Sequence, residues 1–229
     1  MLAKKKKISK KHIKEDKLVS TYYKVQKFYE DNQSKIFIVG GILAVIIIAV
    51  FWYTSKIEQD NLSATTALSR ILSQYETGSY QAAIDGTPGT NIIGLAKIVD
   101  DYGGSEQGET TRIYLAHSYY YLGNIDEAME QYNDYSGSNE LLIATALAGK
   151  ASCYEVKEDY ESAADSYMEA SSVSSSNPQN PDYLLNAGIN YIKSNSYDDA
   201  KESLTILKKE YKNSNLANNA DKYLALIGE

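Results

Sequence analysis

The sequence predicts an all-α protein in which one membrane-spanning helix is followed by a stack of helical hairpins. Three observations support this prediction. Residues 36–53 form an uncharged apolar run, a helical-hairpin pattern recurs about every 35 residues after it, and only 3 Pro occur among the 229 residues. Long helices tolerate few prolines, because each one removes a backbone hydrogen bond.

The apolar run reads IFIVGGILAVIIIAVFWY, from Ile36 to Tyr53, without a charge, a proline or an amide side chain. As a helix it is about 27 Å long, close to the roughly 30 Å thickness of the hydrocarbon layer. Lys35 and Lys56 flank the run, and Trp52 suits the membrane interface. We therefore expect a transmembrane helix over residues 36–55, which would be the protein's contact with the membrane.

Two other interpretations of this run fit less well. A cleaved signal peptide has an apolar core of about 7–15 residues, whereas this run is longer and follows 35 residues of polar character. A buried helix of a soluble domain would carry a polar stripe, which the run lacks.

Charge differs sharply on the two sides of the run. Residues 1–35 contain eleven Lys and four acidic residues, a net charge of +7, whereas residues 56–229 contain twelve basic and 26 acidic residues, a net charge of −14. The positive-inside rule then predicts a cytoplasmic N-terminus and an extracytoplasmic domain over residues 56–229, anchored in the cytoplasmic (inner) membrane. The negative domain disfavours binding to nucleic acid.

The basic tail, residues 1–35, has two further properties. Its lysines fit topology and attraction to anionic lipid better than nucleic-acid binding, because a membrane span follows. Leu18, Tyr22, Val25 and Tyr29 recur at helical spacing. This spacing predicts an amphipathic helix, either at the membrane interface or in solvent.

Three segments after the run share one pattern: a small residue, Tyr three residues later, Ala nine residues after that, and a large residue four further on. The three sets are Ala116, Tyr119, Ala128, Tyr132; Ala151, Tyr154, Ala163, Tyr167; and Gly188, Tyr191, Ala200, Leu204. The successive alanines are 35 and 37 residues apart. Small residues let two helices approach while aromatic residues fill the space beside them. We expect Tyr119 and Tyr132 in the core of the first set.

The pattern predicts hairpin units at about residues 64–100, 109–140, 144–175 and 181–212, with a capping helix over 216–227. The first unit is a weaker copy, marked by Gly78, Tyr80 and Ala83. It is followed by a turn, a helix over residues 92–102 and a Gly-Gly loop. The second helix of each strong unit is predicted to begin with acidic residues, in the sequences DEA, ESA and DDA. Acidic side chains favour a helix N-terminus.

These positions resemble the tetratricopeptide repeat, a helix-turn-helix unit of about 34 residues. The best match is Leu115, Ala116, Tyr119, Gly123, Ala128 and Tyr132. Glu158 departs from the pattern, because it stands where the first unit has its turn residue Gly123. The resemblance implies a tetratricopeptide-type α-solenoid.

The layout of the whole chain is also similar to a bacterial envelope family. A Lys-rich tail, one span and a repeat domain with DDYGGS before its first strong repeat resemble the ancillary subunit that accompanies the secretory translocon. The resemblance implies protein or peptide partners, among them exported polypeptides and periplasmic chaperones.

The search for catalytic chemistry predicts no enzyme, no metal and no cofactor. His12 and His117 lie on opposite sides of the predicted membrane, and Cys153 is the only cysteine, so neither a two-His metal site nor an intramolecular disulfide is expected. No phosphate-loop, dinucleotide, zinc-protease or serine-hydrolase motif occurs. DDYGGS lacks the lysine and preceding strand of a phosphate loop and indicates the end of a helix.

The resemblance places the concave surface of the solenoid on the first helix of each unit. The groove residues it implies are Ile113, His117, Tyr120 and Tyr121, then Ala148, Ser152 and Glu155, then Leu185, Ile189 and Ile192. Such a surface, apolar and aromatic with an acidic rim, suits a peptide segment. The alternative is that these residues pack against the helix at 92–102 or the C-terminal helix.

Two functions follow as hypotheses. The first is a membrane-anchored scaffold that binds polypeptides in the cell envelope. The second is a self-assembling structural envelope protein without a groove. In that case a homo-oligomer would form in which Gly40 and Ala44 help the spans to pair.

Overall fold

The computed structural model describes the backbone of residues 10–228 and the side chains from residue 17 onward. The start of the basic tail, residues 1–9, and the side chain of His12 therefore lie outside the described part of the chain. Two compact units are present, Met1–Lys56 and Ile57–Glu229.

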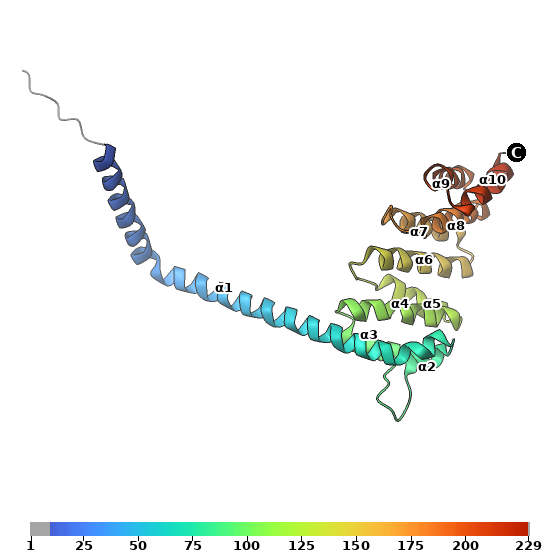
Figure 1. Ribbon diagram of the computed structural model, residues 1–229, viewed down its shortest axis with the longest axis horizontal. Coiled ribbons are helices and arrows are strands. Elements are labelled where there is room, and N and C mark those ends of the chain that lie inside the picture. The colour runs from blue at the N-terminus through green and yellow to red at the C-terminus, as the bar shows by residue number, and fades with distance from the viewer. Residues whose placement is uncertain (1–9, 229) are drawn as a thin grey trace, which may run out of the picture. The chain divides into compact units, whose positions relative to one another are not determined.

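The prediction of an all-α protein is confirmed, because the described residues form helices and no strand (Figure 1). The helices are α1 (Lys10–Glu76), α2 (Tyr80–Asp85), α3 (Leu95–Tyr102), α4 (Glu106–Tyr121), α5 (Ile125–Asn133), α6 (Glu140–Val156), α7 (Tyr160–Ser172), α8 (Asn180–Lys193), α9 (Tyr197–Glu210) and α10 (Asn215–Ile227).

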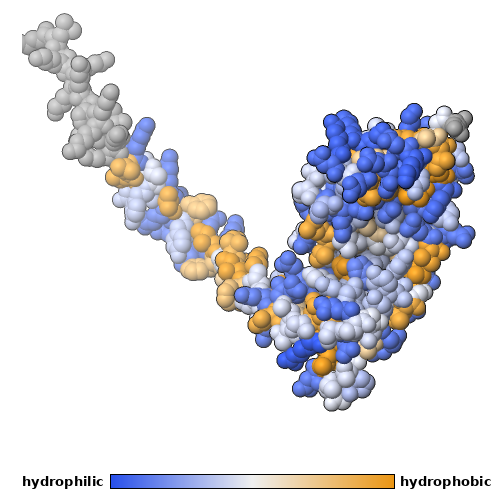
Figure 2. All heavy atoms as spheres, turned by 45° about the vertical axis from the view of Figure 1, so that its right-hand side comes forward, coloured by the Kyte–Doolittle hydropathy of each residue, from blue (hydrophilic) through white to orange (hydrophobic). Residues whose placement is uncertain are grey.

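The helix α1 contains the apolar run and is long and apolar enough to cross a membrane. Its most apolar stretch has a mean hydropathy of 2.8, and none of that stretch is buried within the protein. Figure 2 shows hydrophobic residues on the outside of this helix. Phe37, Ile47 and Phe51 are among those exposed. Apolar side chains that find no protein partner favour a lipid environment.

The last part of α1 has a different role, because it belongs to the second unit. Ala64 and Ile71 are fully buried there, in a core shared with Leu95 and Ile98 of α3. The side-chain oxygen of Asn61 also accepts a hydrogen bond of 2.8 Å from the backbone amide of Gln107 at the start of α4. This part of α1 therefore forms the first helix of the folded domain.

Consecutive helices from α3 onward pack against one another, so that α4–α5, α6–α7 and α8–α9 form hairpins. Small residues make the close contacts. Ala116 and Ala151 are fully buried. A Cβ atom added at Gly188 would lie 2.7 Å from Cδ2 of Leu204, so a side chain there would displace α9 from α8. Tyr132, Tyr167 and Tyr191 fill the space beside these contacts.

Four helices, α1, α4, α6 and α8, end in the same hydrogen-bonded turn. The second residue after each helix has a positive φ: Gly78 (76°), Gly123 (81°), Glu158 (60°) and Asn195 (64°). Its amide donates to the carbonyl three residues earlier, and the next amide donates to the carbonyl five residues earlier. This is the Schellman arrangement, which satisfies carbonyls at a helix end. Glu158 thus adopts the same backbone as the glycine it replaces.

Two expectations need correction. The third helix begins at Leu95 instead of Ile92, because Ile93 pairs with Gly86 in an isolated β-bridge and the amide of Thr87 donates to the carbonyl of Ile92. Because the backbone is extended at Ile92 and Ile93, the helix begins only at Leu95. Tyr119, expected in the core, is only half-buried and packs at the edge of two clusters.

Candidate functional site

A cleft with a volume of about 500 Å³ opens on the second unit, between side chains of α4, α6 and α8. The residues that line it are His117, Tyr120, Tyr121, Tyr132, Thr145, Ala148, Gly149, Ser152, Tyr167, Gln179, Asp182, Tyr183 and Asn186. This volume is within the range of pockets that bind small molecules or peptide side chains.

One wall of the cleft is built around His117. Its ring meets that of Tyr132 edge-on at 5.8 Å, and its Nδ1 lies 3.3 Å from the hydroxyl of Tyr75 at the end of α1. Burial lowers the pKa of His117, so the imidazole is neutral at pH 7. Burial also raises the pKa of Tyr75 to about 12. Uncharged rings therefore form this wall.

The rim beside this wall carries the most exposed tyrosine of the cleft. Tyr121 is 59% exposed, and its ring stacks on that of Tyr80 at 4.8 Å. The ring of Tyr120 meets Tyr121 edge-on at 5.9 Å and packs inward against the core between α4 and α6. The two adjacent tyrosines thus differ: Tyr121 is accessible, and Tyr120 joins the rim to the core.

The opposite wall is organised by Tyr167 of α7. Its hydroxyl lies 3.1 Å from Oγ of Ser152 and donates to Oε2 of Glu155 at 3.0 Å. The other oxygen of Glu155 accepts from Nδ2 of the buried Asn190 at 2.8 Å. The rings of Tyr167 and Tyr183 stack at 6.5 Å. Burial raises the pKa of Tyr167, so its hydroxyl stays protonated.

The predicted groove residues fall into two groups. His117, Tyr120, Tyr121, Ala148 and Ser152 line the cleft. The prediction is wrong for Ile113, which is 4% exposed and lies in the core between α4, α5 and α6. Glu155 does not line the cleft either, because its carboxylate is bound behind Tyr167 by the contacts described above.

The predicted residues of α8 also face away from the cleft. Leu185 is buried, and Ile189 and Ile192 pack with it against α9 and α10. The physical reason is that α10 packs on α8 as well as on α9, so the most apolar stripe of α8 is covered. The polar side chains Gln179, Asp182 and Asn186 face the cleft in their place.

Three tyrosines at the cleft were not among the predicted site residues. Tyr132 and Tyr167 occupy the large-residue position of the repeat, which predicts core. Both rings are indeed buried, yet their edges reach the cleft. The only sign of Tyr132 in the sequence is Gly149, a glycine in the middle of a predicted helix. In the structure, a Cβ added at Gly149 would lie 2.3 Å from Cζ of Tyr132. The third residue, Tyr183, gave no such signal.

Among the described residues that line the cleft, Asp182 carries the one charge. The remaining groups are hydroxyls, amides, small side chains and neutral aromatic rings. Cys153 is buried nearby, and burial raises the pKa of its thiol to about 11, so it is not a reactive thiolate. Such a site suits non-covalent binding through stacking and hydrogen bonds.

Comparison with protein families finds no family model that matches the chain. Comparison with curated proteins finds no significant match either.

Proposed function

We propose that this chain is a membrane-anchored scaffold whose cleft binds polypeptide segments in the cell envelope. The observation that carries the proposal is the cleft itself, because its lining comes mainly from α4, α6 and α8, the first helices of three successive hairpins. A surface built from repeated helices is long enough to follow an extended chain.

The proposal treats residues 56–229 as a tetratricopeptide-type solenoid. In support, the small residues of the repeat are buried, and the turn residues Gly123, Glu158 and Asn195 are 35 and 37 residues apart, like the alanines of the repeat. Repeat arrays of this kind generally bind other proteins.

The lining of the cleft favours a polypeptide as ligand. Tyrosine rings offer large stacking surfaces, while hydroxyl and amide groups can pair with the backbone of an extended chain. The carboxylate of Asp182 adds a preference for neutral or cationic segments over acidic ones.

The proposed location rests on α1 and on charge. The helix is long and apolar enough to cross a membrane, and the lysine-rich residues 1–35 precede its apolar run. We place the N-terminus in the cytoplasm and the cleft outside it, by the positive-inside rule. The similarity in plan to the ancillary translocon subunit suggests exported polypeptides or periplasmic chaperones as partners.

Photo-crosslinking tests the proposal in cells. A photoreactive amino acid in place of Tyr121 should capture polypeptides, whereas the same probe at Tyr197 of α9, which is 49% exposed but outside the cleft, should not. Adding Ala148→Trp, which fills the cleft, should abolish the capture from position 121. If a folded protein yields no polypeptide adduct at 121, or equal adducts at both positions, the cleft does not bind polypeptides.

A further inference from the structure

The cleft offers different chemistry to a ligand at its two ends. At the α4 end the lining is aromatic and is made of His117, Tyr120 and Tyr121. At the α8 end most of the lining is polar, and it includes the carboxylate of Asp182. A polypeptide segment that lies along the cleft therefore meets an aromatic end and a polar, negatively charged end.

The α8 end presents a row of hydrogen-bond acceptors. Asp182 and Asn186 follow Gln179 by three and seven residues, a spacing that puts all three on one face of the helix. The carboxylate of Asp182 is exposed and makes no ion pair with any residue that the structure describes. Ammonium and guanidinium groups only donate hydrogen bonds, so a carboxylate between two amide groups suits them.

The α4 end presents one open aromatic face. Tyr80 stacks on Tyr121 at 4.8 Å with the ring planes 18° apart, so one face of Tyr121 is covered and the other is left for a ligand. An aromatic or apolar side chain packs well on such a face. Tyrosine faces attract cations too, but the α8 end adds the carboxylate of Asp182, so a cation is held more strongly there.

The domain's own cations leave the cleft to a ligand. Lys150 lies over the ring of Tyr154 at 5.8 Å and Lys193 over that of Tyr160 at 4.8 Å, and neither tyrosine lines the cleft. Among the side chains that the structure describes, no lysine or arginine lines the cleft. Residues 56–229 hold 26 acidic and twelve basic residues, so the field of the domain attracts positive charge.

The width of α6 sets the distance between the two ends, because α6 lies between α4 and α8 in the stack (Figure 1). Ala148 and Gly149 of α6 line the cleft there, and their small side chains let a peptide backbone pass close. A helix is about 10 Å across and an extended chain advances about 3.3 Å per residue, so crossing α6 takes at least about three residues. We infer, building on the proposed function, that the cleft selects segments in which an aromatic or apolar residue and a lysine or arginine are at least about three residues apart. The first packs on Tyr121, and the second pairs with Asp182.

Peptide binding to the full chain in detergent tests this selectivity. The probe is a fluorescently labelled synthetic peptide in which three Ser separate a Trp from a Lys. Replacing its Lys by Gln should weaken binding at least about fivefold, because the ion pair and the aromatic contact of the cation are lost. In Asp182→Asn the two peptides should bind alike. The matched control is Asp198→Asn, which removes another exposed aspartate from the first turn of a helix but outside the cleft, and it should keep the preference for Lys.

Two further changes test the arrangement of the ends. A peptide with Trp and Lys side by side should bind as weakly as the Gln peptide, because it cannot reach both ends at once. Tyr121→Ala should remove the contribution of the Trp and keep the preference for Lys. If wild type binds the Lys and Gln peptides equally, or if Asp182→Asn keeps the preference, the selectivity is overturned while the cleft still binds polypeptides. If a folded protein binds none of the peptides, the proposed function fails as well.

Discussion

At the scale of single residues, the turns that end the first helices are under unequal strain. Gly78 and Gly123 adopt a positive φ without cost, but Glu158 holds the same conformation with φ at 60°. A side chain in this region is disfavoured because its Cβ approaches the backbone. Neither bond of the turn depends on the side chain of Glu158, since both are made by the backbone.

We predict that Glu158→Gly raises the free energy of unfolding by about 0.5–1 kcal/mol, the relief of the left-handed strain less the entropy that glycine adds to the unfolded chain. Chemical denaturation of the full chain in detergent would measure it. The reciprocal change, Gly123→Ala, should lower stability. A stabilising effect of both changes would contradict this account of the turn.

The second prediction at this scale concerns pH. Burial lowers the pKa of His117 in the folded protein below its ordinary value of about 6.5. Below pH 6.5 the unfolded chain therefore takes up a proton that the folded chain binds more weakly, and stability falls as the pH is lowered; above that value His117 adds no pH dependence. The melting temperature should fall less between pH 7.5 and pH 5.5 for His117→Gln than for the wild type. His12→Gln, which removes the other histidine, serves as control. If the pH dependence of stability were the same in His117→Gln as in the wild type, His117 would not be its source.

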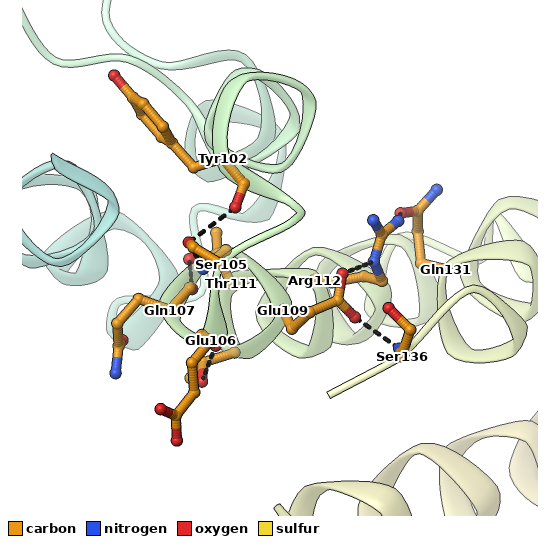
Figure 3. Close-up of polar contacts among 11 residues, drawn as sticks. Tyr102, Ser105, Glu106, Gln107, Glu109, Thr111, Arg112, Gln131 and Ser136 are labelled. Atoms are coloured by element: carbon orange, nitrogen blue, oxygen red, sulfur yellow. Dashed lines mark hydrogen bonds and ion pairs between the residues drawn. The ribbon is translucent and has the colours of Figure 1, made fainter. Parts of the chain in front are cut away.

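At the scale of elements, a buried ion pair within α4, between Glu109 and Arg112, is hydrogen-bonded to α5 and to the chain just after it (Figure 3). Oε1 of Glu109 accepts from Nε of Arg112 at 3.1 Å, and Oε2 accepts from the amide of Ser136 just after α5 at 2.7 Å. Arg112 also donates to Oε1 of Gln131 in α5 at 3.1 Å. With Glu109 only 4% exposed, this network fixes how the first hairpin closes.

We expect Glu109→Gln to lower the free energy of unfolding by about 2 kcal/mol, because the change leaves the charge of Arg112 buried without its counter-charge. Lys97→Gln, which breaks the exposed pair with Asp101, is the matched control and should leave stability nearly unchanged. Denaturant titration of the three proteins makes the comparison. Equal effects of the two substitutions on the free energy of unfolding would show that the buried pair of Glu109 and Arg112 stabilises the fold no more than an exposed pair does.

The elements also show where sequence patterns reach their limit. Hairpin periodicity predicts α4 to α9, because small and aromatic residues recur at fixed intervals. It does not predict the face of α8 that meets the cleft. An apolar stripe looks the same whether it lines a groove or is covered by another helix, and the packing of α10 decides that Leu185 is covered.

At the scale of the whole molecule, topology is the property that most needs a direct test. The charge difference across the apolar run predicts that the second unit lies outside the cytoplasm. An enzyme that is active only outside the cytoplasm, fused after Glu229, should therefore be active. The same enzyme fused after Lys35, before the run, should be inactive. Activity of the second fusion alone would reverse the proposed orientation.

The sequence by itself determined the all-α class, the apolar helix and the periodic hairpins, because these depend on local composition and on spacing along one chain. The resemblance to the tetratricopeptide repeat further implied that His117, Tyr120, Tyr121 and Ser152 lie in a groove, and these residues line the cleft. Only the tertiary structure decided that Ile113 and Leu185 are core, that Tyr132, Tyr167 and Tyr183 reach the cleft, and that the end of α1 is part of the domain. These outcomes depend on contacts between helices distant in sequence, and a pattern of residue types does not reveal which helix will cover which face.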